Sequence, residues 1–250
     1  MTNIFWGPLP VMTLTVRQFM GGKAVRVVTA LGFLPCLFAL IYLLNEESAT
    51  RIEFLRDTVL NGLFFPTLLP ITVLILATGA LGNEVEDRTL PYLTLKPLSR
   101  FRIVVEKWLG SIVVAIPAIC LGLLVTSLIV LRGDASDSTR TIAGALIATV
   151  IGICAYTAIF MFISLIIQRA LLVGILYTFV WESILGRYLP GLRLVSVRHF
   201  VTSIYERIQD NPTLFSDGIA RLSSAVIVLL ATTVACLLFS TRRLRRMSLD

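Results

Sequence analysis

Five long runs without a charged residue constrain the fold more than any other feature of the sequence. Each run is 18 to 28 residues long, and a helix needs about 20 mostly apolar residues to cross the hydrocarbon core of a membrane. The runs are 27–44, 58–83, 108–131, 141–168 and 222–241. A sixth run of 17 residues, 170–186, is interrupted only by Glu182. The chain is therefore predicted to cross a membrane six times.

The composition agrees with a membrane protein and excludes several soluble classes. Apolar residues make up 56% of the 250 residues and charged residues 15%, against about a quarter charged in soluble domains. A soluble domain of this size cannot hide so much apolar surface from water, so a soluble enzyme, a disordered chain and a disulfide scaffold are excluded. The four cysteines lie in apolar stretches away from the single histidine, which argues against a metal site.

The distribution of Lys and Arg indicates the orientation, because cytoplasmic loops of membrane proteins collect these residues. If the N-terminus lies inside, the inner segments hold 13 of the 22 Lys and Arg residues and the outer segments hold 9. This favours a multi-pass protein of the cell (inner or plasma) membrane with both termini in the cytoplasm. The same rule explains the net charge of +7, and we expect no nucleic-acid partner. The first apolar run exceeds the apolar part of a signal peptide, so we expect it to remain as a membrane helix.

The predicted fold class is an all-α membrane protein with six transmembrane helices, an N-terminal interfacial helix and a long outer loop before the last span. Residues 1–26 hold the interfacial helix, 27–241 the six-span domain, and 242–250 a basic cytoplasmic tail. Within the domain, 83–103 form a cytoplasmic loop, and 187–221 form the outer loop with an amphipathic helix. The spans are placed at about 27–44, 60–82, 104–131, 142–167, 170–188 and 222–241.

Two short amphipathic helices are predicted outside the spans. The first covers residues 11–19, ends at Gly21-Gly22 and is expected to lie in the headgroup layer, although a plain tail is also compatible with the pattern. Its apolar side is formed by Met12, Val16, Phe19 and Met20. The second begins after Ser196, which is placed to cap it, and is compatible with either a lid or a solvated cap. Its apolar positions are Val197, Phe200, Val201, Ile204 and Ile208.

Small residues recur every four positions in the fourth predicted span, at Gly144, Ala148 and Gly152. Small residues at this spacing let a second helix approach closely, and we expect that helix to belong to the same molecule. Kinks or breaks are predicted at three prolines inside spans, Pro35, Pro70 and Pro117.

The loop between the second and third spans carries the most specific pattern in the chain. Its charged residues change from acidic to basic along the loop, and include Glu84, Glu86, Asp87, Arg88, Lys96 and Arg100. Ser99 is placed to cap the helix that follows. Glu106 and Lys107 come at the entry of the third span, where we expect them to reach water.

This loop resembles the corresponding segment of ABC-2 type permeases, the membrane subunits of ATP-binding-cassette transporters. The family pattern is an acid-x-acid pair, a Thr-Leu pair, a Pro-x-Ser-Arg and a lysine that enters the next helix. The residues that meet it are Glu84, Glu86, Thr89, Leu90, Pro97, Ser99, Arg100 and Lys107. The resemblance implies that the chain is the permease subunit of an ABC transporter, an exporter, and forms the translocation pathway.

The resemblance also implies partners and the residues that meet them. ABC-2 permeases pair with a second permease subunit, identical or homologous, and bind two cytosolic ABC ATPase subunits while membrane lipid surrounds the spans. The residues implied in coupling to the ATPases are Glu84, Glu86, Asp87, Arg88, Thr89, Leu90, Tyr92 and Arg100. The N-terminal interfacial helix is implied to contribute Arg17, Phe19 and Lys23.

The chain is not expected to be an enzyme. It has no G-x-x-x-x-G-K-[ST] motif, which is the loop that cradles the phosphates of a bound nucleotide. ATP and Mg²⁺ are therefore expected on the partner ATPase, and no cofactor or metal is expected in this chain.

The fifth predicted span holds one acid, Glu182, next to Trp181. Ionisable residues inside a membrane are costly and usually functional, so this pair is a candidate pathway or gate. An ion pair with Arg187 in the outer interface is equally compatible with the sequence.

Three other functions fit less well. The main alternative is a membrane scaffold that recruits an ATPase without translocating a solute. An ion-coupled carrier usually needs several intramembrane charges, and Glu182 is a single one. A membrane-embedded enzyme is disfavoured because the spans hold no His, Asp and Glu cluster.

Overall fold

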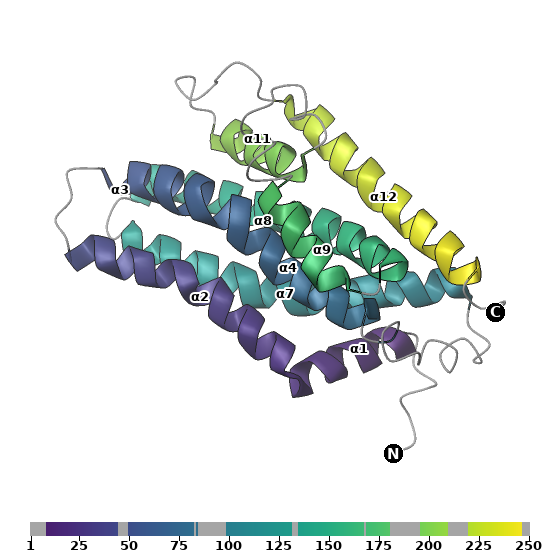
Figure 1. The fold of residues 1–250 in the computed structure, drawn as a ribbon. Coiled ribbons are helices and arrows are strands. Elements are labelled where there is room, and N and C mark those ends of the chain that lie inside the picture. The colour runs from purple at the N-terminus through teal and green to yellow at the C-terminus, as the bar shows by residue number, and fades with distance from the viewer. Residues whose placement is uncertain are drawn as a thin grey trace.

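Backbone polar groups cannot stay unpaired in lipid, so apolar runs of this length are expected to be helical. The computed structural model describes residues 9–44, 50–82, 84, 99–131, 135–167, 169–180, 196–209 and 220–246. All regular secondary structure in these ranges is helical, which confirms the predicted all-α class (Figure 1).

The helices of the described ranges follow one another along the chain. In order they are α1 (Pro10–Gly21), α2 (Lys23–Leu44), α3 (Arg51–Glu53), η1 (Phe54–Leu68), α4 (Leu69–Ala77), η2 (Thr78–Gly82), α7 (Arg100–Val130), α8 (Ala135–Ile166), α9 (Ala170–Leu176), α11 (Val197–Gln209) and α12 (Leu222–Arg246). The segments α3, η1, α4 and η2 form one rod, Arg51–Gly82, in which η1 and η2 are π-helical.

Five helices in the described part of the chain are long and apolar enough to cross a membrane. They are Lys23–Leu44, Arg51–Gly82, Arg100–Val130, Thr139–Ile166 and Leu222–Arg246. These correspond to five of the six predicted spans. The remaining one, at 170–188, begins as the apolar helix Ala170–Val180, and its last eight residues lie outside the described ranges.

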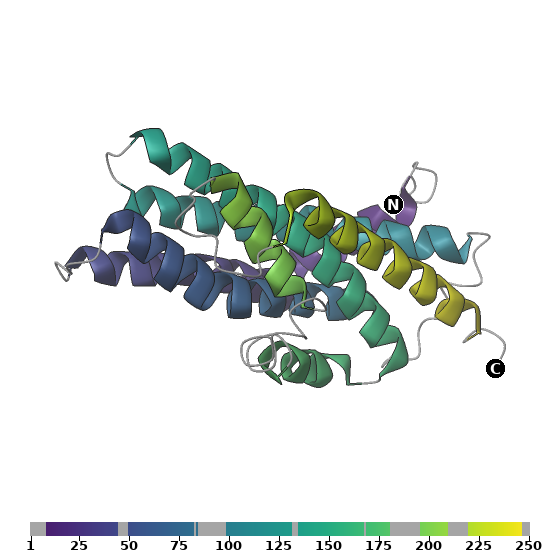
Figure 2. The same ribbon diagram turned by 90° about the horizontal axis from the view of Figure 1, so that it is seen from above.

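The rod Arg51–Gly82 lies at the centre of the bundle, and α2 and α12 lie at its edge (Figures 1 and 2). In the most apolar stretch of each helix, 67% of the residues of the rod are buried, against 22% in α2 and 17% in α12. The outer faces of α2 and α12 carry exposed large apolar side chains. These faces suit contact with lipid, because their exposure to water would be unfavourable.

A close helix crossing joins α2 to α7 through two glycines. A Cβ atom on Gly122 would overlap the carbonyl oxygen of Gly32, and one on Gly32 would lie 2.6 Å from the carbonyl oxygen of Ala118. At the same crossing the Cys36 Sγ lies 3.1 Å from the Thr126 Oγ1. Backbones can approach this closely only where no side chain intervenes.

The three prolines that predicted kinks have different outcomes. α2 continues as a helix through Pro35 and α7 continues through Pro117. Pro70 lies in the first turn of α4, where the π-helical segment η1 gives way to an α-helix. Proline has no backbone N–H to donate to the preceding turn of the helix. A change of helix type is therefore favoured near it.

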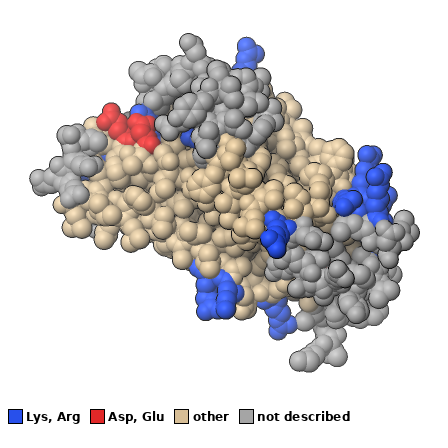
Figure 3. Space-filling model, in the orientation of Figure 1, with Lys and Arg blue, Asp and Glu red and all other residues tan. Residues whose placement is uncertain are grey.

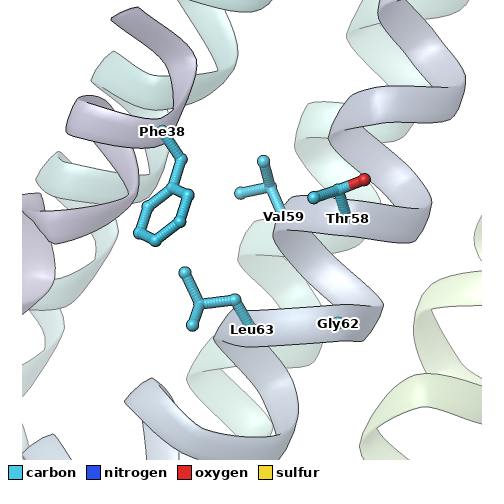
Figure 4. A pocket seen from close by; sticks show the side chains of 5 residues that line it. All are labelled: Phe38, Thr58, Val59, Gly62 and Leu63. Atoms are coloured by element: carbon cyan, nitrogen blue, oxygen red, sulfur yellow. The ribbon is translucent and has the colours of Figure 1, made fainter. Parts of the chain in front are cut away.

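A side cavity of about 270 Å³ separates α2 from η1. Figure 4 shows Phe38 of α2 facing Val59 and Leu63 of η1 across it, with Thr58 and Gly62 on the same wall. Gly62 offers no side chain to fill the space, so the two helices are less tightly packed here than at the Gly32–Gly122 crossing.

The helix α11 lies across α8 and the start of α12, outside the set of long helices (Figure 1). The Ser196 Oγ accepts a hydrogen bond from the His199 N–H (3.3 Å), which confirms the predicted cap. A Cβ atom on Gly144 would lie 3.2 Å from Ile208, and one on Gly152 would lie 3.1 Å from Val201. The small-residue stripe of α8 therefore receives α11, and the prediction of packing within the molecule is confirmed.

Charges are distributed unequally between the two ends of the bundle. Lys and Arg side chains gather where α1 and the last turns of α12 lie, and this is named the α1 end (Figures 1 and 3). The exposed acids Glu53 and Asp57 lie at the opposite end, near α3. Asp57 forms a bidentate pair with its neighbour Arg56 there, at 2.8 and 2.9 Å.

Candidate functional site

Three consecutive residues of α7, named the α7 junction, connect this helix to three different neighbours. They are Glu106, Lys107 and Trp108. Consecutive residues of an α-helix point about 100° apart, so a run of three can reach three separate elements. Here those elements are α1, η2 and α8.

Glu106 closes the N-terminus of α1. Its Oε2 accepts hydrogen bonds from the N–H groups of Val11 (2.7 Å) and Met12 (3.2 Å), and its Oε1 accepts one from the Arg102 Nε (2.5 Å). The side chain of a residue at the N-cap position normally satisfies these helix donors, but Leu9 has no acceptor in its side chain. The carboxylate of α7 takes over that role, and its negative charge also suits the positive end of the helix dipole.

Lys107 ties α7 to the end of the central rod. Its Nζ donates hydrogen bonds to the Glu84 Oε1 (2.5 Å) and to the carbonyl oxygen of Ala80 (2.5 Å) in η2. Ala80 belongs to the last turn of η2, where carbonyl groups lack partners within their own helix. A lysine ammonium is a favourable partner for such carbonyls.

Trp108 completes the junction toward α8. Its indole Nε1 donates a hydrogen bond to the carbonyl oxygen of Cys154 (3.1 Å). This contact fixes the α7 helix against α8 on the side away from α1. Together the three residues fasten the first part of α7 to α1, η2 and α8.

The burial of this junction corrects an expectation from the sequence. Glu106 and Lys107 were expected to reach water, but they are only 1% and 2% exposed. Both charges are compensated, since Glu106 has an arginine and two N–H donors and Lys107 has a carboxylate and a carbonyl. Buried charges persist in proteins when they are paired and hydrogen-bonded in this way.

The helix α1 rests on two glycines beside the junction. A Cβ atom on Gly79 of η2 would lie 3.2 Å from the ring of Phe19, and one on Gly110 of α7 would lie 3.0 Å from the Thr15 Cβ. The Thr15 Oγ1 donates to the carbonyl oxygen of Val11 (2.8 Å), which satisfies its hydroxyl and lets it be buried. α1 therefore contacts both the central rod and α7.

The side of α1 that is buried in the protein shares Phe19 with the apolar side that the sequence predicts for the headgroup layer. α1 spans Pro10–Gly21 and breaks at Gly22, as the sequence indicates, and Phe19 is buried. The other buried residues are Pro10, Val11 and Thr15, whereas Met20 is 71% exposed. Thr15 contacts Gly110, and Val16 packs partly buried against the core. That the apolar side of α1 lies in the headgroup layer stays a prediction.

The described residues include five of the predicted site residues. Glu84 pairs with Lys107, and Arg100 is the first residue of α7, after the Ser99 cap whose Oγ accepts from the Arg102 N–H (3.3 Å). On α1 and at the start of α2, Phe19 is buried while Arg17 and Lys23 are exposed. The predicted site residues that lie outside the described ranges are Glu86, Asp87, Arg88, Thr89, Leu90, Tyr92, Trp181 and Glu182.

The sequence analysis places Glu106 at the entry of the third span but assigns it no role in the site, and it does not single out Trp108. One signal for Glu106 is present in the sequence, because Arg102 lies one helical turn before it and forms an i,i+4 ion pair with it. The partner helix α1 lies 95 residues earlier, and no local pattern reveals that contact.

The arrangement is suited to transmitting force rather than to bond-making chemistry. It joins a surface helix, the end of the central rod and α7 through buried ion pairs and hydrogen bonds. Membrane helices are stiff because their backbone hydrogen bonds are internal, so a displacement of α1 or of the end of η2 is passed to α7.

Comparison with known proteins gives a family for the chain. A search among curated proteins finds no match. The sequence model of a family described as "ABC-2 family transporter protein" matches residues 12–249, which is nearly the whole chain. The matched range includes the α7 junction, all five long apolar helices and most of α1. This chain is a multi-pass membrane protein that belongs to the ABC-2 family of transporter proteins.

Proposed function

We propose that this chain is the permease subunit of an ABC exporter, with six membrane crossings and both termini in the cytoplasm. It forms the translocation pathway together with a second permease subunit. Two separate cytosolic ATPase subunits bind ATP and Mg²⁺, and this chain does not hydrolyse ATP itself. The loop 83–103 and the interfacial helix α1 receive the movement of the ATPases.

The observation that carries this proposal is the α7 junction. Glu106 holds α1, and Lys107 holds the end of η2 together with Glu84, the first acid of the loop 83–103. Both elements that the family resemblance assigns to ATPase contact are thus fastened to the same point of α7. A push on either element moves α7 and the central rod together.

The arrangement of the helix ends supports six crossings. α1 and the last turns of α12 lie at the same end of the bundle (Figure 1). An even number of crossings places both ends of the chain on one side. The basic residues gathered at the α1 end support a cytoplasmic location for it (Figure 3).

The ATPases can drive the permease only if their closed form binds one permease state better than another. Exposed charges at the α1 end supply such differential contacts, and Arg17 and Lys23 are exposed there. The ion pair of buried Lys107 with the largely buried Glu84 then acts as a mechanical link and not as a docking contact.

The contact is tested by charge reversal on α1 with a matched control at the opposite end. We expect Arg17→Glu with Lys23→Glu to reduce co-purification of the ATPase at least tenfold, because the basic docking surface becomes acidic. The control is Arg140→Glu with Arg221→Glu, which changes two exposed arginines outside the α1 end. Equal loss of ATPase in both variants, or in neither, contradicts the assignment of α1 as a docking element.

Export is distinguished from scaffolding in inverted membrane vesicles that contain the permease and its ATPase. We expect ATP to change the lipid or solute content of the vesicles, measured by untargeted mass spectrometry against a variant ATPase that cannot hydrolyse ATP. ATP turnover without any translocated species would establish the scaffold function instead.

A further inference from the structure

A second cluster of basic residues lies apart from the α7 junction, between the C-terminal ends of α8 and α12. It surrounds a pocket of about 400 Å³. The pocket is lined by Phe162, Ile166, Phe239, Arg242, Arg243 and Arg246. These residues form the arginine pocket, and neither the family assignment nor the proposed coupling gives it a role.

The charge of the arginine pocket is not compensated by the described acids. Arg242, Arg243 and Arg246 are exposed, and no ion pair joins them to an acid in the part of the chain that the structure describes. The described acids of the α1 end, Glu84 and Glu106, bind Lys107 and Arg102 instead. Figure 3 shows the resulting basic surface at the end of α12.

The floor of the arginine pocket is aromatic. The rings of Phe162 and Phe239 lie 6.0 Å apart, and Phe239 is 51% exposed, as is its apolar neighbour Leu238 at 50%. The pocket therefore opens beside a helix face that carries apolar side chains outward. A ligand that fills it must present an apolar part to the phenylalanines and an anionic part to the arginines.

The dimensions of the pocket match the headgroup layer of a membrane. At 1.5 Å per residue the helix rises about 5 Å from Phe239 to Arg242, the first arginine of the pocket, and about 10 Å to Arg246, the last. The polar layer on each side of a bilayer is about 5–8 Å thick. The uncharged part of α12 ends at Thr241, just before Arg242, and α8 ends at Ile166. A membrane surface at this level places the phenylalanines at the edge of the hydrocarbon and the arginines among the headgroups.

We propose that the arginine pocket binds the headgroup of an anionic phospholipid. The phosphate oxygens accept hydrogen bonds from the three arginines, and the glycerol and upper acyl chains lie against Phe162 and Phe239. Basic pockets between membrane helices bind anionic lipids by this combination of charge and apolar contact. An acidic protein surface satisfies the arginines but offers no apolar chain to lie against the phenylalanines.

The site is tested with the purified full-length chain in detergent, titrated with phosphatidylglycerol and, separately, with phosphatidylcholine. Native mass spectrometry counts the lipid molecules retained. We expect the variant Arg242→Gln, Arg243→Gln, Arg246→Gln to bind phosphatidylglycerol about a hundredfold more weakly than the wild type, from a factor of about five for each arginine. Phosphatidylcholine, which is zwitterionic, binds the wild type weakly and the variant equally weakly.

A matched control removes the same charge elsewhere on the α1 end. Arg17→Gln, Lys23→Gln, Arg26→Gln changes three exposed basic residues of α1 and α2, and its lipid affinity is expected to equal that of the wild type. Equal losses in the two triple variants would show a general effect of charge and would overturn the proposal.

Two further measurements keep the proposal open to refutation if the triple variant is unstable. Phe239→Ala leaves all three arginines in place and is expected to weaken phosphatidylglycerol binding at least fivefold. Soluble glycerol 3-phosphate is expected not to compete with the lipid at millimolar concentration. Effective competition would identify a site for a free anion and would overturn the lipid assignment. The lipid assignment would also be overturned if the triple variant lost ATPase binding in lipid-free detergent, because that result would identify a protein contact.

Discussion

Glu106 does for α1 what a capping side chain does within one helix, but from 95 residues away. This placement makes a single carboxylate responsible for the N-terminus of α1, for Arg102 and for the register between α1 and α7. Removing one member of a buried, hydrogen-bonded charge network leaves the others uncompensated, which costs more than the network itself contributes.

We expect Glu106→Ala to destabilise the α1 end by about 3 kcal/mol, because the Val11 and Met12 N–H groups and Arg102 lose their acceptor. Hydrogen exchange of the α1 amides measures this directly, and those of α12 serve as an internal reference. Glu106→Gln is expected to lose less, since its amide oxygen still accepts from the helix donors. Unchanged exchange in α1 for Glu106→Ala would show that the cap is not needed.

The residue Glu206 on α11 provides a prediction about pH. Burial raises the pKa of Glu206 above its usual value, nearby Arg56 partly offsets this, and Asp57 adds to it. The native state therefore holds this proton more tightly than the unfolded chain. The stability that the carboxyl contributes is present below the unfolded pKa and is lost as pH rises through the native pKa.

We expect the wild type to lose thermal stability relative to Glu206→Gln as pH rises from about 4 to about 7, because glutamine stays neutral over this range. Melting curves of the two proteins at matched pH give the difference and remove the contributions of all other groups. A difference that is constant with pH, or that changes in the opposite direction, contradicts the assignment.

Helices of this protein approach one another where side chains are absent. Gly32 and Gly122 set the crossing of α2 with α7, Gly79 and Gly110 receive α1, and Gly144 and Gly152 receive α11. In lipid the association of helices depends on close packing, since the solvent is as apolar as the side chains. Each glycine thus acts at the level of a helix pair.

The crossing of α2 with α7 is the one that we expect to tolerate substitution least. Gly122→Ala places a Cβ atom on top of the carbonyl oxygen of Gly32, so the helices must separate, at a cost of about 1–3 kcal/mol. Thermal unfolding in detergent measures this loss. Gly21→Ala is the matched control, because nothing lies within 4 Å of its added Cβ atom. Equal stability of the two variants would show that the crossing can adapt.

At the scale of the whole molecule, features that depend on local sequence could be predicted. Five spans follow from the length of uncharged runs, and the caps at Ser99 and Ser196 follow from the residues around them. The small-residue stripe of α8 predicted a packing partner within the molecule, although only the structure identifies α11 as that partner.

The features that could not be predicted depend on contacts between distant segments. Glu106 and Lys107 look like residues at a wet helix entry, and their burial depends on α1 and η2, which come earlier in the chain. The buried face of α1 follows from the same contacts and not from the periodicity of its own apolar residues. Hydrophobic periodicity indicates that a helix has a face, but the position of its partner decides which residues fill it.

The distant cap of α1 has a consequence for the order of synthesis. The ribosome makes Val11 long before it makes Glu106, and an uncapped helix of 12 residues is only marginally stable by itself. We therefore expect α1 to stay weakly structured until α7 has been inserted and Glu106 can accept hydrogen bonds from its N-terminus. On this expectation the docking of α1 comes after the insertion of α7.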